Sequence, residues 1–74
     1  MKVVWVVNWD DLSSAWSSRE KALEYLRGEM KRINATMTIT EECDYFFWVA
    51  VQYEDGDIEH FYCTRYEVDE LPYI

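Results

Sequence analysis

The chain has few of the residues that disulfide, metal and catalytic sites require. Its 74 residues include two cysteines, one histidine, one proline and two glycines. Cys43 and Cys63 would lie about 16 Å apart along one hairpin, beyond the ~7 Å at which a disulfide can form. We therefore expect free thiols, as in a reducing cytoplasm. A zinc site that includes His60 is excluded because the ligands are scattered and no CxxC spacing is present.

Long apolar runs and catalytic motifs are also missing. The run Val3–Val7 has only five apolar residues, too few for the apolar region of a signal peptide or for a membrane span. His60 has no serine or cysteine partner at a recognisable spacing, so a surface or cross-strand histidine is the better interpretation. We expect no enzyme activity, no cofactor and no membrane association.

Basic residues are almost absent from the second half of the chain. Residues 1–33 carry six Lys and Arg against five Asp and Glu, a net charge of +1. Residues 34–74 carry one Arg against ten Asp and Glu, a net charge of −9. This imbalance argues against direct binding to nucleic acid or to an anionic membrane, because both carry negative charge.

Aromatic residues are abundant for so short a chain. Three Phe, four Trp and six Tyr occur in a single expected domain, residues 1–74. A domain of this size buries only about 60% of the surface that its unfolded chain exposes. The rings compensate for the short length, and they also exceed what one small core can hide. Some of them should therefore lie at a surface or an interface.

The segment from Tyr45 to Tyr66 predicts a β-hairpin around Asp55-Gly56, a dipeptide that suits a two-residue type I′ turn. This turn places Tyr53 opposite Ile58 and Cys63 opposite Trp48. One face would then hold Tyr45, Phe47, Val49, Val51, Tyr53, Ile58, His60, Tyr62, Thr64 and Tyr66, and the other Phe46, Trp48, Ala50, Gln52, Glu59, Phe61, Cys63 and Arg65.

A helix is predicted between two strands. The segment Lys2–Trp9 is apolar on both alternating faces, which favours a strand inside the sheet rather than at its edge, and 12–16 is predicted as a connecting loop. Ser17 and Glu20 match a capping box at the start of the helix, and Asn34 suits a left-handed stop. The apolar stripe of the helix consists of Ala22, Leu23, Leu26, Met30 and Ile33.

Three smaller predictions complete the fold. Gly28 lies inside the helix, and we expect a bulky ring from the sheet to approach it closely. Residues 36–40 predict a short strand or the entry to the hairpin, and residues 68–74 predict an acidic tail with apolar contacts from Leu71, Tyr73 and Ile74. The result is an α+β domain with elements in the order β-α-β-β: an antiparallel sheet of three or four strands with one helix across one face.

One helix can cover only one face of the hairpin, and the sequence leaves open which one. Uncovered rings beside carboxylates predict a contact surface for another protein or for a second copy of the chain. In the first hypothesis, a non-catalytic module inhibits a partner by covering its basic surface; in the second, a structural domain forms a homodimer. The predicted partner-binding residues are Phe46, Trp48, Glu54, Asp55, Asp57, Glu59, Phe61 and Arg65.

Two resemblances bear on function. The opening KVVWVVNWDD resembles the start of CRISPR-associated ferredoxin-like nucleases, which implies metal-binding by Asp10 and Asp11; the chain has no room for the second helix and last strand of that fold. In size, acidity and lack of catalytic residues, the whole chain resembles small phage-encoded inhibitors: anti-CRISPR proteins, anti-restriction DNA mimics and uracil-DNA glycosylase inhibitors. That resemblance implies a protein partner in the cytoplasm of a host cell.

Overall fold

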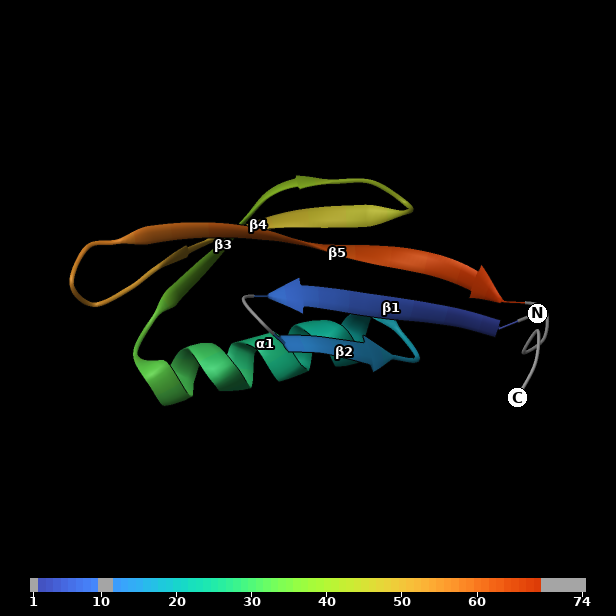
Figure 1. Cartoon of the computed structure of the whole chain (residues 1–74), viewed down its shortest axis with the longest axis horizontal. Coiled ribbons are helices and arrows are strands. Elements are labelled where there is room, and N and C mark those ends of the chain that lie inside the picture. Colours follow the sequence, from blue (N-terminus) through green and yellow to red (C-terminus); the bar gives the residue numbers. More distant parts are fainter. Residues whose placement is uncertain (1, 10–11, 69–74) are drawn as a thin grey trace.

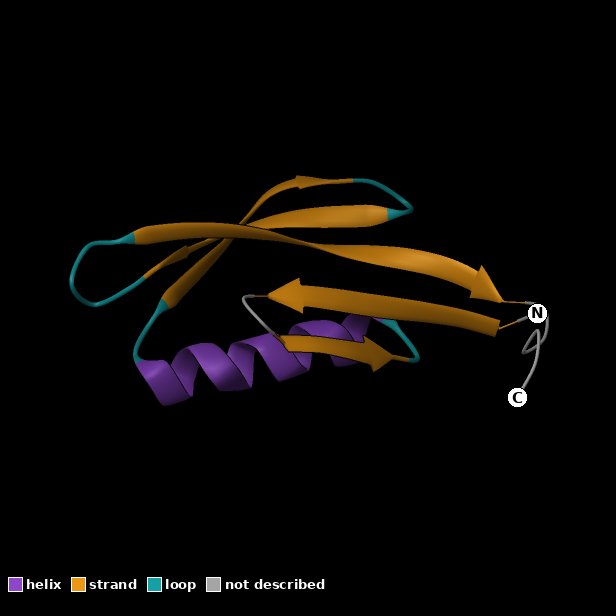
Figure 2. Ribbon diagram, in the orientation of Figure 1, coloured by secondary structure: helices purple, strands orange, loops and turns teal. Residues whose placement is uncertain are grey.

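A computed structural model describes residues 2–9 and 12–68. The fold is α+β, with one helix packed on one face of a five-stranded antiparallel sheet (Figures 1 and 2). The strand order is β2-β1-β5-β4-β3. The elements are β1 (Lys2–Trp9), β2 (Leu12–Trp16), α1 (Arg19–Ile33), β3 (Thr36–Glu42), β4 (Phe46–Gln52) and β5 (Ile58–Val68).

The predicted class is confirmed, but the strand count and the order of elements are corrected. Leu12–Trp16, predicted as a loop, is strand β2, and it pairs with β1 from Trp5↔Trp16 to Trp9↔Leu12. The order is therefore β-β-α-β-β-β, with five strands. Strand β1 lies between β2 and β5, as its apolar character on both faces predicts.

Strand β3 is a separate strand at one edge of the sheet. It pairs with β4 from Thr36↔Gln52, and its register shifts between Ile39 and Glu41. Such a shift is a β-bulge, which adds one residue to the outer strand and increases its local twist.

The helix begins one residue later than the sequence predicts. Ser18, not Ser17, is the N-cap, and its hydroxyl accepts a 3.2 Å hydrogen bond from the backbone N–H of Lys21. Because the third helical position is therefore Lys21, the predicted capping box with Glu20 does not form. At the other end, Asn34 has the predicted left-handed conformation, with φ of 57°.

The helix packs on the sheet through the predicted apolar stripe, of which Ala22, Leu23, Leu26 and Met30 are buried. The predicted close contact at Gly28 is wrong: an added Cβ there would meet nothing within 4 Å. A contact from the start of the helix also joins it to the sheet. Arg19 forms a 2.7 Å ion pair with Glu42, and its guanidinium carbon lies 5.2 Å from the ring centroid of Phe47.

The hairpin forms as predicted, but its register differs by one residue. Gln52 pairs with Ile58 and Phe47 pairs with Cys63. The backbone N–H of Gly56 donates to the carbonyl of Tyr53 (3.0 Å), and Gly56 is left-handed, with φ of 97°. This is a three-residue loop ending in a glycine bulge, and it uses the same Asp-Gly dipeptide as a type I′ turn.

Because side chains alternate along a strand, this shift moves every β5 side chain to the face opposite the one predicted. The apolar residues of β5 therefore join those of β4 beneath the helix. Both thiols are free; Cys43 is exposed and Cys63 is buried. The buried core consists of Trp5, Val7, Trp9, Ala22, Leu23, Leu26, Met30, Phe47, Val49, Val51, Phe61 and Cys63.

Candidate functional site: the open face of the sheet

In the part of the chain that the structure describes, one face of the sheet has no helix across it (Figure 2). Directly paired residues of neighbouring strands share a face, so the register assigns the side chains of this face. We call it the open face; its central members are Val4 and Val6 on β1, Phe46, Trp48, Ala50 and Gln52 on β4, and Ile58, His60, Tyr62, Thr64 and Tyr66 on β5.

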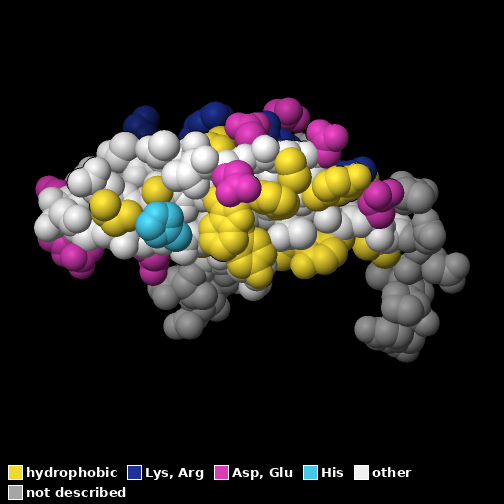
Figure 3. All heavy atoms as spheres, turned by 90° about the horizontal axis from the view of Figure 1, so that it is seen from above, with side chains coloured by type: hydrophobic (Ala, Val, Ile, Leu, Met, Phe, Trp, Pro, Cys, Tyr) yellow, Lys and Arg dark blue, Asp and Glu magenta, His cyan; other side chains and the backbone are white. Residues whose placement is uncertain are grey.

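Large rings on the open face remain exposed. Trp48 and Tyr62, which pair across β4 and β5, are 39% and 40% exposed, and their ring centroids lie 5.1 Å apart. Tyr66 is 50% exposed and Ile58 60% exposed. Figure 3 shows hydrophobic side chains gathered on one side of the molecule, with Asp and Glu side chains at several places around them.

The open face carries little charge. Among the described residues that the register places on it, the charged ones are Lys2, at one end of β1, and Glu41, opposite Trp48. Glu41 therefore borders the ring cluster at Trp48, whereas the residues paired with Tyr62 on β1 and β4 are uncharged. Most carboxylates lie elsewhere: at the hairpin tip, on α1, at the end of β3 and on the helix-facing side of β5.

The predicted partner-binding residues fall into three separate groups. Phe46 and Trp48 lie on the open face. Glu54, Asp55 and Asp57 are exposed at the hairpin tip. The remaining three, Glu59, Phe61 and Arg65, belong to the opposite, helix-facing side.

The shifted register accounts for the third group. Phe61 is only 4% exposed and stacks on Trp9, with ring centroids 5.3 Å apart. Arg65 pairs with Trp5 in the sheet and forms a 3.4 Å ion pair with Glu67. The face that sequence reasoning assigned to Phe61 and Arg65 is therefore corrected.

Glu59 is a structural acceptor inside the fold. Its Oε1 accepts a 2.5 Å hydrogen bond from the hydroxyl of Tyr53 and a 2.9 Å bond from the indole N–H of Trp9. The bonds from Tyr53 and Trp9 stabilise the charged form and lower the pKa of the carboxyl below its ordinary value. Glu59 thus joins β1 and the two strands of the hairpin.

Sequence reasoning missed Tyr62 as the neighbour of Trp48, and it placed Tyr66 and Ile58 on the face opposite Trp48. The signal that could have placed them is the alternation of side chains along β5, in which Phe61 and Cys63 share one face and are its apolar residues. Setting Phe61 and Cys63 beside Val49 and Phe47 gives one consistently apolar face for the helix, and this requires the bulged loop rather than the type I′ turn.

In residues 2–9 and 12–68, no group of three or more His, Cys, Asp or Glu side chains is placed to hold a metal ion. The carboxylates of Asp10 and Asp11, and the predicted apolar contacts of Leu71, Tyr73 and Ile74, lie outside the described residues.

Within that same described part of the chain, no helix has the length and apolar character needed to cross a lipid bilayer. Comparison of the chain with known protein families, with curated proteins and with solved structures found no match.

Proposed function

We propose that the chain is a non-catalytic protein-binding module that docks its open face on a partner protein with a basic surface. The observation that carries the proposal is the exposed pair of Trp48 and Tyr62 on the open face of the sheet. Exposed clusters of large apolar side chains on small proteins mark interaction sites. Trp and Tyr are also the residue types that most often dominate binding energy.

The location of the rings on strands favours tight docking. Strand pairing holds Tyr62 between β1 and β4, and it holds Tyr66 against β1, so binding has less side-chain and loop freedom to remove. The open-face residues of β4 and β5 can be dehydrated without removing a carboxylate of those strands from water. Glu41, opposite Trp48 on β3, has to stay in water or meet a basic group of the partner, because burying an unpaired charge is costly.

Charge supports a basic partner. The chain has a net charge of −8, and Glu54, Asp55 and Asp57 project at the hairpin tip, beside the end of the open face. Charges at the rim of an interface accelerate encounter with an oppositely charged protein, whereas desolvated rings at the centre slow dissociation. We assign steering to the acidic tip and anchoring to the rings.

A module that covers a basic surface would keep nucleic acid off it, because the same Lys and Arg side chains bind phosphates. An inhibitor of the anti-CRISPR or DNA-mimic kind, acting in the cytoplasm of a host cell, fits this proposal. The free thiols of Cys43 and Cys63 support a reducing compartment.

A second candidate function is self-association through the same face. It is favoured by the shortage of charge there: two copies could stack their rings while their acidic tips remain in water. In that case the chain would be a structural homodimer. The two candidates differ in their response to salt, because an electrostatic complex weakens with ionic strength and a dimer of packed rings does not.

The test combines two variants and a control. Trp48→Ser with Tyr62→Ser removes the ring pair; Glu54→Gln, Asp55→Asn and Asp57→Asn together neutralise the tip; Arg27→Gln changes an exposed position on α1. Proteins captured from cell extract by the immobilised chain are measured in low and high salt. We expect the ring variant to lose capture, the tip variant to bind more slowly, and the control to behave as the unmodified chain.

Capture that survives loss of the ring pair would refute the docking proposal, and capture unaffected by salt and by the tip variant would refute the basic partner. Light scattering over a concentration series decides the second candidate. A dimer that the ring variant abolishes would establish self-association, and a monomer at high concentration would eliminate it.

A further inference from the structure

A notch in the sheet lies beside the N-terminal end of β1. Strand β5 pairs with β1 along Lys2, Val3 and Val4, but β2 pairs with β1 only from Trp5 onward. After Trp16 the chain turns away into the helix. Among the residues that the structure describes, 2–4 therefore have a strand on one side and none on the other.

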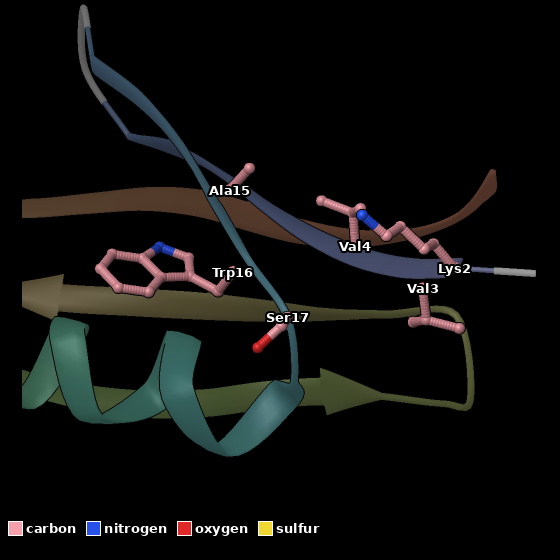
Figure 4. A pocket seen from close by; sticks show the side chains of 6 residues that line it. All are labelled: Lys2, Val3, Val4, Ala15, Trp16 and Ser17. Atoms are coloured by element: carbon pink, nitrogen blue, oxygen red, sulfur yellow. The ribbon is translucent and has the colours of Figure 1, made fainter. Parts of the chain in front are cut away.

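A hollow of about 300 Å³ occupies this notch. Figure 4 shows Val4 and Ala15 pointing to one side of the sheet and Val3 to the other, with Ser17 at the corner where the chain leaves β2. The hollow is lined by Lys2, Val3, Val4, Ala15, Trp16 and Ser17. Lys2 is the one charged residue in this lining, and it forms no ion pair among the described residues.

We propose that the notch binds an extended peptide segment of a partner protein, which adds to the sheet in line with β2 and carries a carboxylate next to its apolar anchor. The free side of residues 2–4 offers backbone groups that pair with an extended chain, the basis of recognition by strand addition. The notch borders the open face and shares Lys2 and Val4 with it, but the inference rests on the backbone of residues 2–4 and not on the exposed rings.

Sheet geometry fixes the side-chain pattern of the peptide. A residue opposite Val3 shares the face of Val3 and Trp16, where the lining is apolar, so it should be an aliphatic residue. The next position lies opposite Lys2, on the other face, where a carboxylate meets the ammonium group.

The probe is a capped peptide of sequence Thr-Val-Ile-Glu-Thr, added to the full chain and followed through its amide resonances by NMR. The two comparison peptides are Thr-Val-Ile-Lys-Thr, with reversed charge, and Thr-Val-Pro-Glu-Thr, in which proline removes a backbone donor. We expect shifts at the amides of residues 2–4 and 15–17, binding about two- to fivefold weaker for the Lys peptide, and none for the Pro peptide.

Two protein variants complete the test. Ala15→Arg places a long side chain in the notch, and Ser13→Arg places the same side chain on the same face of β2, opposite Asn8. Ala15→Arg should abolish the shifts and Ser13→Arg should retain them. Absence of shifts with the Glu peptide, equal binding of all three peptides, or binding that survives Ala15→Arg would overturn the proposal. Shifts of the same amides with protein concentration alone would assign the notch to a second copy and would also overturn it.

Discussion

The indole N–H of Trp9 donates a 2.9 Å hydrogen bond to Oε1 of Glu59, fifty residues further along the chain. The same oxygen accepts from the hydroxyl of Tyr53. One carboxylate therefore ties the end of β1 to both strands of the hairpin, on the side of the sheet opposite the open face.

This arrangement predicts a pH-dependent contribution to stability. The pKa of Glu59 is lowered from 4.5 by the bonds from Tyr53 and Trp9. A carboxyl group with a lowered folded-state pKa stabilises the fold above its ordinary pKa, and this contribution is lost as the pH falls through the folded-state value. Glu59→Gln should therefore lower the free energy of unfolding at pH 7 by about 1 kcal/mol, and the difference from the unmodified chain should shrink towards pH 3.

Urea unfolding at pH 7 and pH 3 measures this effect. Glu54→Gln, at the exposed hairpin tip, is the matched control and should change the unfolding midpoint little. A Glu59→Gln difference that is the same at both pH values would show that the charge of the carboxylate has no part in the contact.

Replacement of the two glycines by alanine should change the stability of the fold in opposite directions. Gly56 has φ of 97°, a conformation that costs an L-residue roughly 1–2 kcal/mol, so Gly56→Ala should destabilise the chain. Gly28 lies in α1, and an added Cβ meets nothing within 4 Å; Gly28→Ala should stabilise it by up to about 1 kcal/mol. Thermal unfolding of both variants provides the measurement, and equal signs would contradict the structure.

Two adjacent serines provide a test of the helix start. Ser18→Ala removes the hydroxyl that accepts from the Lys21 N–H and should cost about 1 kcal/mol of stability. Ser17→Ala removes a hydroxyl outside the cap and should cost much less. Urea midpoints of the two variants distinguish them, and a larger loss for Ser17→Ala would restore the capping box that the sequence suggests.

The two cysteines should differ sharply in reactivity. Burial raises the pKa of the Cys63 thiol to about 12, so at pH 8 almost none of it is in the nucleophilic thiolate form. Cys43 is exposed. A chromogenic disulfide reagent should therefore modify one thiol of the native chain rapidly and the second only after denaturation. In Cys43→Ser the rapid phase should vanish; its persistence would mean that Cys63 is accessible.

Much of the fold follows from local patterns in the sequence. The uniform apolar run of β1, the apolar stripe from Ala22 to Met30 and the left-handed stop at Asn34 are each set by a few neighbouring residues. Their physical signals are strong because burial and backbone conformation act at those positions directly. The helix, the hairpin and the inner strand could therefore be predicted.

The features that could not be predicted, the hairpin register and strand β2, depend on alternatives between which the local sequence does not decide. Asp55-Gly56 serves a two-residue turn and a bulged three-residue loop equally well, and the helix decides between them by requiring Phe61 and Cys63 beneath it. Strand β2 contains Ser13 and Ser14, which have no strong strand preference, and it forms because β1 offers it an edge. The candidate site depends on the choice between these two loops. The sequence placed Trp48 and Phe46 on one face, but it did not place Tyr62 and Tyr66 beside them.

The bulge in β3 has a consequence for lateral growth of the sheet. A strand with a register shift between Ile39 and Glu41, and with Glu41 and Glu42 at its end, presents an irregular, negatively charged border that resists pairing with another strand. The β2 border is regular and uncharged from Leu12 to Trp16, so it is the more receptive of the two. If two molecules paired through their β2 strands, neither would have another receptive edge. The assembly would then stop at a dimer instead of propagating into a filament.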